Sequence, residues 1–218
     1  MRDTFKMPGS AKFFLIDEFY TLSFNAAVQH NKIYSGGNEV ERRNFKESFK
    51  KNTTEILEGY CLSEINEQQH IDNILQLQSA SKQFENILLN NMLNIGTVQK
   101  ILNLNLKYWW CAGWVKKTPP HCPIDAIVLS SILSIAKNMK IKDSKLKLIK
   151  ECRWTRITTI DKYKEVINAI RDILNASGIT KSLADWELDQ FNEDRALKNK
   201  VEIDVQYEQN KRYKPSNS

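Results

Sequence analysis

Apolar residues recur along most of this chain at the three- and four-residue spacing of amphipathic helices. Turn residues interrupt the pattern at Gly36-Gly37-Asn38, at Gly96 and at Gly178. Between these interruptions the pattern predicts helices, which cover about residues 11–30, 39–60, 63–77, 79–94, 97–113, 126–136, 158–178 and 183–197. The sequence therefore predicts an all-α fold.

The segments on either side of Gly96 predict a helical hairpin over residues 79–112. Its second helix is apolar on most sides, which is typical of a helix at the centre of a fold. Thr97 is a candidate N-cap residue, and the N–H groups of such a helix start favour an anion such as a DNA phosphate. We expect one compact domain over residues 1–197, followed by a charged tail, 198–218, that forms a weak strand or is disordered.

Composition narrows the class of protein. A chain of 218 residues that is 41% hydrophobic can bury one sizeable core. No apolar run approaches the length of about 20 residues that a membrane span needs, and the N-terminus lacks the layout of a secretory signal, so we expect a cytoplasmic protein with no membrane partner. The four cysteines form no C-x-x-C pair, which predicts neither a disulfide framework nor a zinc site. We expect no metal and no cofactor.

The net charge of +6, with a pI of about 9.0, suits a polyanionic partner. Basic residues gather in two segments, and the candidates for contacts with a nucleic-acid backbone are Arg42, Arg43, Lys46, Lys137, Lys140 and Lys145. A solvated helix face is the simpler interpretation of the first cluster, and a phosphate-contacting face is the alternative.

The scarce, chemically distinctive residues are concentrated between Ile95 and Ile135. Lys100 follows Gly96 by about one helical turn. Asp125 ends the segment Pro123-Ile124-Asp125 and begins an apolar helix, where a carboxylate can cap backbone N–H groups. A lysine amine can attack a sugar carbon and form a Schiff base, and a nearby aspartate can stabilise positive charge on that sugar.

Gly96, Lys100 and Pro123-Ile124-Asp125 together resemble the helix-hairpin-helix DNA glycosylases, particularly the bifunctional 8-oxoguanine glycosylases. In that family a Gly-rich hairpin precedes a catalytic lysine, and a Val-Pro-Val-Asp segment supplies a catalytic aspartate at a helix start. The all-helical plan, with no β domain before the hairpin, is most similar to the archaeal members. This chain has one hairpin glycine where the family commonly has two, and a longer loop from the lysine to the aspartate.

The resemblance implies that Lys100 and Asp125 are catalytic and that the partner is duplex DNA containing a damaged base. The residues it suggests for substrate contacts are Gly96, Thr97, Gln99, Trp109, Trp110, Trp114 and His121. The tryptophans are candidates for stacking on a flipped base. The alternative is a non-catalytic helical module that binds nucleic acid or a protein through a basic face, with Lys100 solvated, Asp125 serving only as a cap and the tryptophans in the core.

Overall fold

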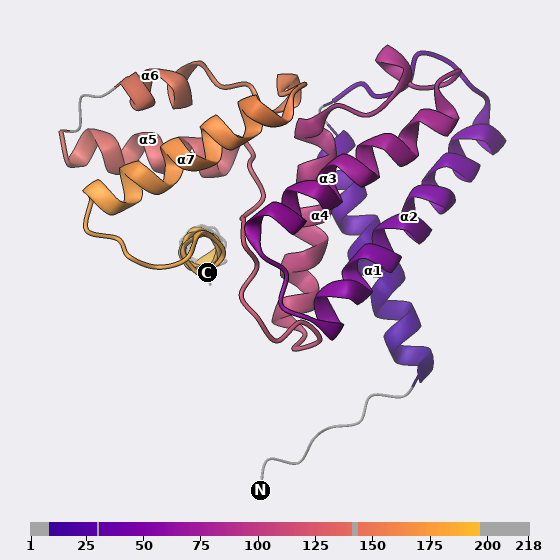
Figure 1. The fold of residues 1–218 in the computed structure, drawn as a ribbon, viewed down its shortest axis with the longest axis horizontal. Coiled ribbons are helices and arrows are strands. Elements are labelled where there is room, and N and C mark those ends of the chain that lie inside the picture. The colour runs from indigo at the N-terminus through magenta and orange to yellow at the C-terminus, as the bar shows by residue number, and fades with distance from the viewer. Residues whose placement is uncertain (1–8, 30, 141–143, 197–218) are drawn as a thin grey trace, which may run out of the picture.

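A computed structural model describes residues 9–29, 31–140 and 144–196 of the chain (Figure 1). Its labelled helices are α1 (Gly9–Val28), α2 (Glu39–Leu62), α3 (Glu67–Ser81), α4 (Ile95–Cys111), α5 (Ala126–Asn138), α6 (Ser144–Glu151) and α7 (Ile160–Ala176). Three short 3-10 turns are η1 (Lys82–Phe84), η2 (Leu89–Asn91) and η3 (Trp154–Arg156), and a last helix covers residues 183–196. The predicted all-α fold is confirmed.

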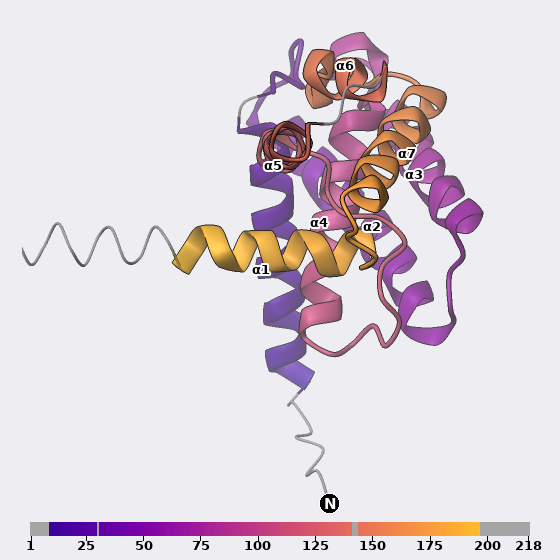
Figure 2. The same cartoon turned by 90° about the vertical axis from the view of Figure 1, so that its left-hand side faces the viewer.

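The helices form two packed groups that α4 joins. In one group α1 packs along α4, while α3 lies between α2 and α4; in the other, α5, α6 and α7 pack on one another. Figure 1 shows the two groups side by side, and α4 also contacts η3 and α7 of the second group. The helix over residues 183–196 is seen end-on in Figure 1 and crosses in front of α1 and α4 in Figure 2.

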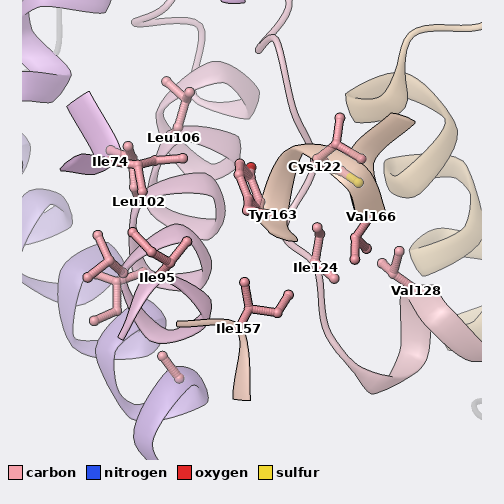
Figure 3. Packing of buried hydrophobic residues seen from close by; sticks show 14 of the residues in the cluster. Ile74, Ile95, Leu102, Leu106, Cys122, Ile124, Val128, Ile157, Tyr163 and Val166 are labelled. Atoms are coloured by element: carbon pink, nitrogen blue, oxygen red, sulfur yellow. The ribbon is translucent and has the colours of Figure 1, made fainter. Parts of the chain in front are cut away.

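Helix α4 is buried on almost all sides, as its apolar pattern predicts. Thirteen of its 17 residues are buried, including polar ones such as Thr97, Gln99 and Asn103. In Figure 3, Tyr163 of α7 lies between α4 and the loop residues Cys122 and Ile124. The core is therefore continuous from α4 through this loop into α7.

The start of α4 differs from its prediction. Asn94, rather than Thr97, is the N-cap residue, and its side chain accepts a hydrogen bond from the Thr97 N–H. The Gly96 N–H donates to Ile157 O at 2.9 Å, and the Val98 N–H donates to Asn94 O. Since other parts of the chain already occupy these donors, they do not form the predicted anion site.

Gly96 is needed for close packing. A Cβ atom built at Gly96 would lie 1.8 Å from the carbonyl oxygen of Trp154, so the backbone of η3 rests directly on α4 at this residue. The Asn94 side chain also donates to Thr155 O at 2.7 Å. The hairpin glycine therefore holds η3 in place.

Two other predicted boundaries are wrong. Residues 82–94 do not form a helix: α3 ends at Ser81, and two short 3-10 turns follow, with Leu88 extended and Asn90 and Asn91 in left-handed backbone conformations. Ser63 is the C-cap of α2, and the N-cap of α3 is instead Asn66, whose side chain forms a capping box with Gln69.

Within the described ranges, no helix combines the length and apolar character required to cross a membrane. The predicted tail, 198–218, lies outside the residues that the structure describes.

We expect Gly96→Ala to lower the free energy of unfolding by about 2 to 3 kcal/mol, because the new methyl group would overlap the Trp154 carbonyl. Gly59→Ala is the matched control: Gly59 lies within α2 with open space around its Cβ position, and alanine there should stabilise by up to about 1 kcal/mol. Urea unfolding of both variants measures the difference. Equal stability of the two variants would contradict the packing role of Gly96.

Candidate functional site

Lys100 and Asp125 lie together. The Lys100 Nζ is 3.4 Å from Asp125 Oδ2, and the side chains are 10% and 21% exposed, respectively. Lys100 projects from α4, while Asp125 stands at the start of α5, so the pair bridges the two groups of helices. The pair is sheltered and still open to solvent on one side.

The two carboxylate oxygens of Asp125 have separate partners. Oδ1 accepts hydrogen bonds from the N–H groups of Ile127 and Val128 at 2.9 and 3.0 Å, which caps α5. Oδ2 is the oxygen that faces Lys100. The cap therefore fixes the direction in which the second oxygen points.

Gln99 attaches the loop before Asp125 to α4. Its amide nitrogen donates to Ile124 O at 2.8 Å, and its amide oxygen accepts from the Ile124 N–H at 3.0 Å. One turn later, Asn103 Nδ2 donates to Cys122 O at 3.2 Å. Because both side chains are buried, these bonds set the position of the residue that precedes Asp125.

We call the hydrogen bonds of Gln99 and Asn103 to Ile124 and Cys122 the clamp. A buried network of hydrogen bonds continues from the clamp into α7 and α3. The Tyr163 hydroxyl lies 3.1 Å from Asn103 Nδ2 and 2.8 Å from His121 Nδ1. His121 Nε2 lies 3.1 Å from Glu67 Oε1, an oxygen that Arg171 also contacts. Burial lowers the pKa of His121 to about 4, against the weaker opposing effect of Glu67. His121 is therefore a neutral structural link at neutral pH.

Aromatic side chains form much of the wall of the cavity onto which Lys100 opens. Its volume is about 520 Å³, and we call it the Lys100 pocket. Its lining residues come from α1, α4, α5, η3 and the last helix; the aromatic ones are Tyr108, Trp154, Trp186 and Phe191. The Lys100 ammonium lies 4.4 Å from the ring centroid of Trp154, within the range of a cation–π contact.

A second ion pair lies in the same wall. Lys107 Nζ contacts Glu187 Oε1 at 2.8 Å and Oε2 at 3.0 Å, with side chains only 7% and 8% exposed. Lys107 also lies 4.5 Å from the ring centroid of Phe191. Burial raises the pKa of Glu187, and the contact with Lys107 opposes that shift. The pocket thus combines aromatic faces with buried hydrogen-bonding groups.

The other residues suggested for substrate contacts do not line the Lys100 pocket. Gly96, Thr97 and Gln99 are buried, and their polar groups have partners within the protein. Trp109 is 1% exposed and packs on Trp114. The remaining two are Trp110, which packs against the core, and His121, which belongs to the buried network. The structure brings together only Lys100 and Asp125 of the predicted site.

The residues predicted to contact a nucleic-acid backbone lie on α2 and around α5 and α6. Figure 1 shows α2 on the far side of α4 from α5 and α7. The Arg42 guanidinium donates to Gly36 O and lies over Tyr34, and Lys145 pairs with Asp172 at 2.7 Å. The other candidates are Arg43, Lys46, Lys137 and Lys140, and none of the four lines the Lys100 pocket.

Sequence reasoning missed most of the pocket residues, among them Lys107, Trp154, Glu187, Gln190 and Phe191. The spacing of Lys100 and Lys107 could have suggested one of them, because residues seven apart lie two turns along the same helix face. No sequence signal relates Trp154 or Glu187 to α4, since packing between distant segments brings them together.

Comparison with known proteins finds no matching protein family, no matching curated protein and no matching solved structure.

We expect acid to destabilise the protein through the buried histidines His70 and His121. Burial lowers the pKa of both His70 and His121 from the usual value of 6.5, to about 4 for His121. Between these values the unfolded chain binds protons that the folded chain does not, so stability present at neutral pH is lost as the pH falls. Urea unfolding should show a decrease of roughly 1 to 2 kcal/mol per pH unit from about pH 6.5 to about pH 4.5.

His70→Gln provides the comparison, because it removes one of the two titrating groups. Its pH dependence over this window should be about half that of the original chain. A free energy of unfolding that stays level across the window in the original chain would contradict the linkage.

Proposed function

We propose that this protein is a DNA glycosylase with lyase activity, which removes a damaged base through a lysine nucleophile. The observation that carries the proposal is the Lys100–Asp125 pair, 3.4 Å apart and open to a cavity with aromatic walls. A nucleophile next to a fixed carboxylate is the arrangement that covalent attack on a sugar carbon requires. The resemblance at Gly96, Lys100 and Pro123-Ile124-Asp125 supports the same class.

In the proposed reaction, the Lys100 amine attacks C1′ of the deoxyribose as the bond to the base breaks. The base leaves with the electron pair of that bond and takes up a proton. Attack requires a neutral amine, and Asp125 Oδ2 is the carboxylate oxygen positioned to accept the ammonium proton. Asp125 then passes this proton to the departing base, so it is ionised again as positive charge develops on the sugar. The sugar then opens to a Schiff base on Lys100, from which elimination of the 3′ phosphate would break the strand.

Asp125 would also act on the sugar. Positive charge develops on the sugar ring as the base departs, and a carboxylate held at the pocket wall stabilises that charge. Its orientation is set before substrate arrives, because the backbone N–H groups of Ile127 and Val128 hold the other oxygen. Preorganised charge of this kind avoids rearrangement during the reaction.

The pocket suits a base that has been turned out of the duplex. Aromatic rings at Trp154 and Phe191 offer stacking faces, while Gln190 and the Lys107–Glu187 pair supply polar groups for its edge. We therefore assign Phe191 and Glu187 to the base and Lys100 and Asp125 to the sugar. The damaged purine 8-oxoguanine is the first substrate to test.

Borohydride trapping tests the chemistry. The full chain, incubated with duplex DNA containing 8-oxoguanine or an abasic site and then reduced, should form a covalent adduct that Lys100→Ala abolishes. Lys162→Ala is the matched control, because Lys162 is an exposed lysine of α7 paired with Glu165, and it should form the adduct as the original chain does. No adduct with either DNA would favour a non-catalytic binding module.

The variant Asp125→Asn separates the negative charge of Asp125 from its structural role as the cap of α5. The amide oxygen can still cap α5, so the variant should fold, whereas the carboxylate opposite Lys100 is lost. We expect the rate of adduct formation to fall about 100-fold or more. A rate within about threefold of the original would contradict the electrostatic role of Asp125.

Phe191→Ala tests the base site. Loss of one stacking face should lower kcat/KM on 8-oxoguanine DNA by about 10- to 100-fold, which corresponds to about 1 to 3 kcal/mol. Trapping on an abasic site is the internal control, because that DNA has no base to stack and should be affected much less. Equal loss on both DNAs would place Phe191 outside the base site.

A further inference from the structure

Three hollows in the protein surface meet at η3. Thr155 lines the Lys100 pocket and two smaller cavities, of about 310 and 260 Å³. The first of these also includes Lys32 and Arg156, and the second includes Lys150 and Arg153. The turn therefore separates the Lys100 pocket from two basic hollows.

The four cations beside η3 are available to a partner. Lys32, Lys150, Arg153 and Arg156 are all exposed. Throughout the described ranges, none of the four forms an ion pair with a carboxylate, whereas Lys145 pairs with Asp172 and Lys162 with Glu165. We call these four residues the η3 rim.

The turn that supports the rim is firmly seated. Its backbone approaches Gly96 too closely for any side chain there, and Asn94 Nδ2 and the Gly96 N–H bond to Thr155 O and Ile157 O on either side of Arg156. Trp154 extends from the same turn to the Lys100 ammonium, 4.4 Å from its ring centroid. The backbone of Arg153 and Arg156 is thus held in a fixed relation to the reacting lysine.

We propose that the η3 rim binds the phosphates of the damaged strand on both sides of the nucleotide in the Lys100 pocket, an inference that rests on the proposed function. A nucleotide turned out of a duplex stays joined to its neighbours through a phosphate on each side. The strand must therefore leave the pocket in two directions, and each phosphate needs a cation near the pocket mouth. The rim offers two cations in each basic hollow, with η3 between them.

Phosphate binding, which the sequence predicted for the backbone N–H groups at the start of α4, is thus assigned to η3. The amides at the start of α4 bond within the protein, so they hold η3, and η3 presents the arginines. Guanidinium groups suit this task because they contact phosphate oxygens through two parallel hydrogen bonds.

Salt-dependent binding tests the proposal. The probe is a duplex that contains a tetrahydrofuran abasic-site analogue, and its affinity for the full chain is measured by fluorescence anisotropy from about 50 to about 200 mM salt. The double variant Arg153→Gln/Arg156→Gln should reduce the slope of log K against log salt by about 2, because each lost phosphate contact removes about 0.9. The control Lys82→Gln/Lys116→Gln removes the same charge from exposed positions in η1 and in the loop after α4, and it should leave the slope almost unchanged.

Replacing single phosphates by uncharged methylphosphonates shows which phosphates the η3 rim contacts. Methylphosphonate substitution at the phosphates immediately 5′ and 3′ of the analogue should weaken binding by the original chain at both positions. The η3 double variant should lose little further affinity at these two positions, because its contacts there are already gone.

Several results would overturn the proposal. An unchanged slope for the η3 variant, an equal loss for the Lys82/Lys116 control, or full sensitivity of the η3 variant to methylphosphonate would each exclude the rim as the phosphate site. If the original chain still forms the borohydride adduct in any of these cases, the proposed function stands and only the rim is rejected. If the original chain neither binds DNA nor forms an adduct, both proposals fail.

Discussion

The hydrogen bonds between the Gln99 amide and the Ile124 peptide hold Asp125 beside Lys100. Lys100 and Asp125 belong to different groups of helices, and nothing in the helices alone would place them together. The Gln99 side chain pairs with both the N–H and the C=O of Ile124, so the next residue can stand only at the pocket mouth. Because unpaired polar groups at this depth are costly, the arrangement is both stable and specific.

Around this contact, hydrogen bonds from buried polar side chains join the helices and the loop to one another. Asn103, Tyr163 and His121 extend the clamp from α4 to α7, and Glu67 with Arg171 carries it to the surface. A wholly apolar α4 would pack as tightly but would leave the carbonyl groups of the loop without donors. The need to satisfy a buried irregular loop therefore explains the presence of Gln99 and Asn103 in a central helix.

Much of the fold could be predicted because helical periodicity and capping are local. The pattern identified α4 as central, and Asp125 as the cap of α5. The errors arose where one local pattern is compatible with two structures. Asn90 and Asn91 fit a helical pattern but adopt left-handed backbone conformations. Gly96 fits a turn but lies within α4, where it allows close packing. The pair Lys100 and Asp125 was inferred from a motif, whereas Trp154 and Glu187 depend on contacts between segments far apart in sequence.

The clamp on Cys122 and Ile124 has a consequence for how related chains should be searched for. Since Asp125 is positioned from the end of its loop, the stretch between Trp114 and Thr118 contributes little to its place, and we expect its length to differ among related chains. A fixed number of residues between lysine and aspartate is therefore a poor signature. A better one pairs the glutamine and asparagine of α4 with a proline two residues before the aspartate, and allows any gap between them.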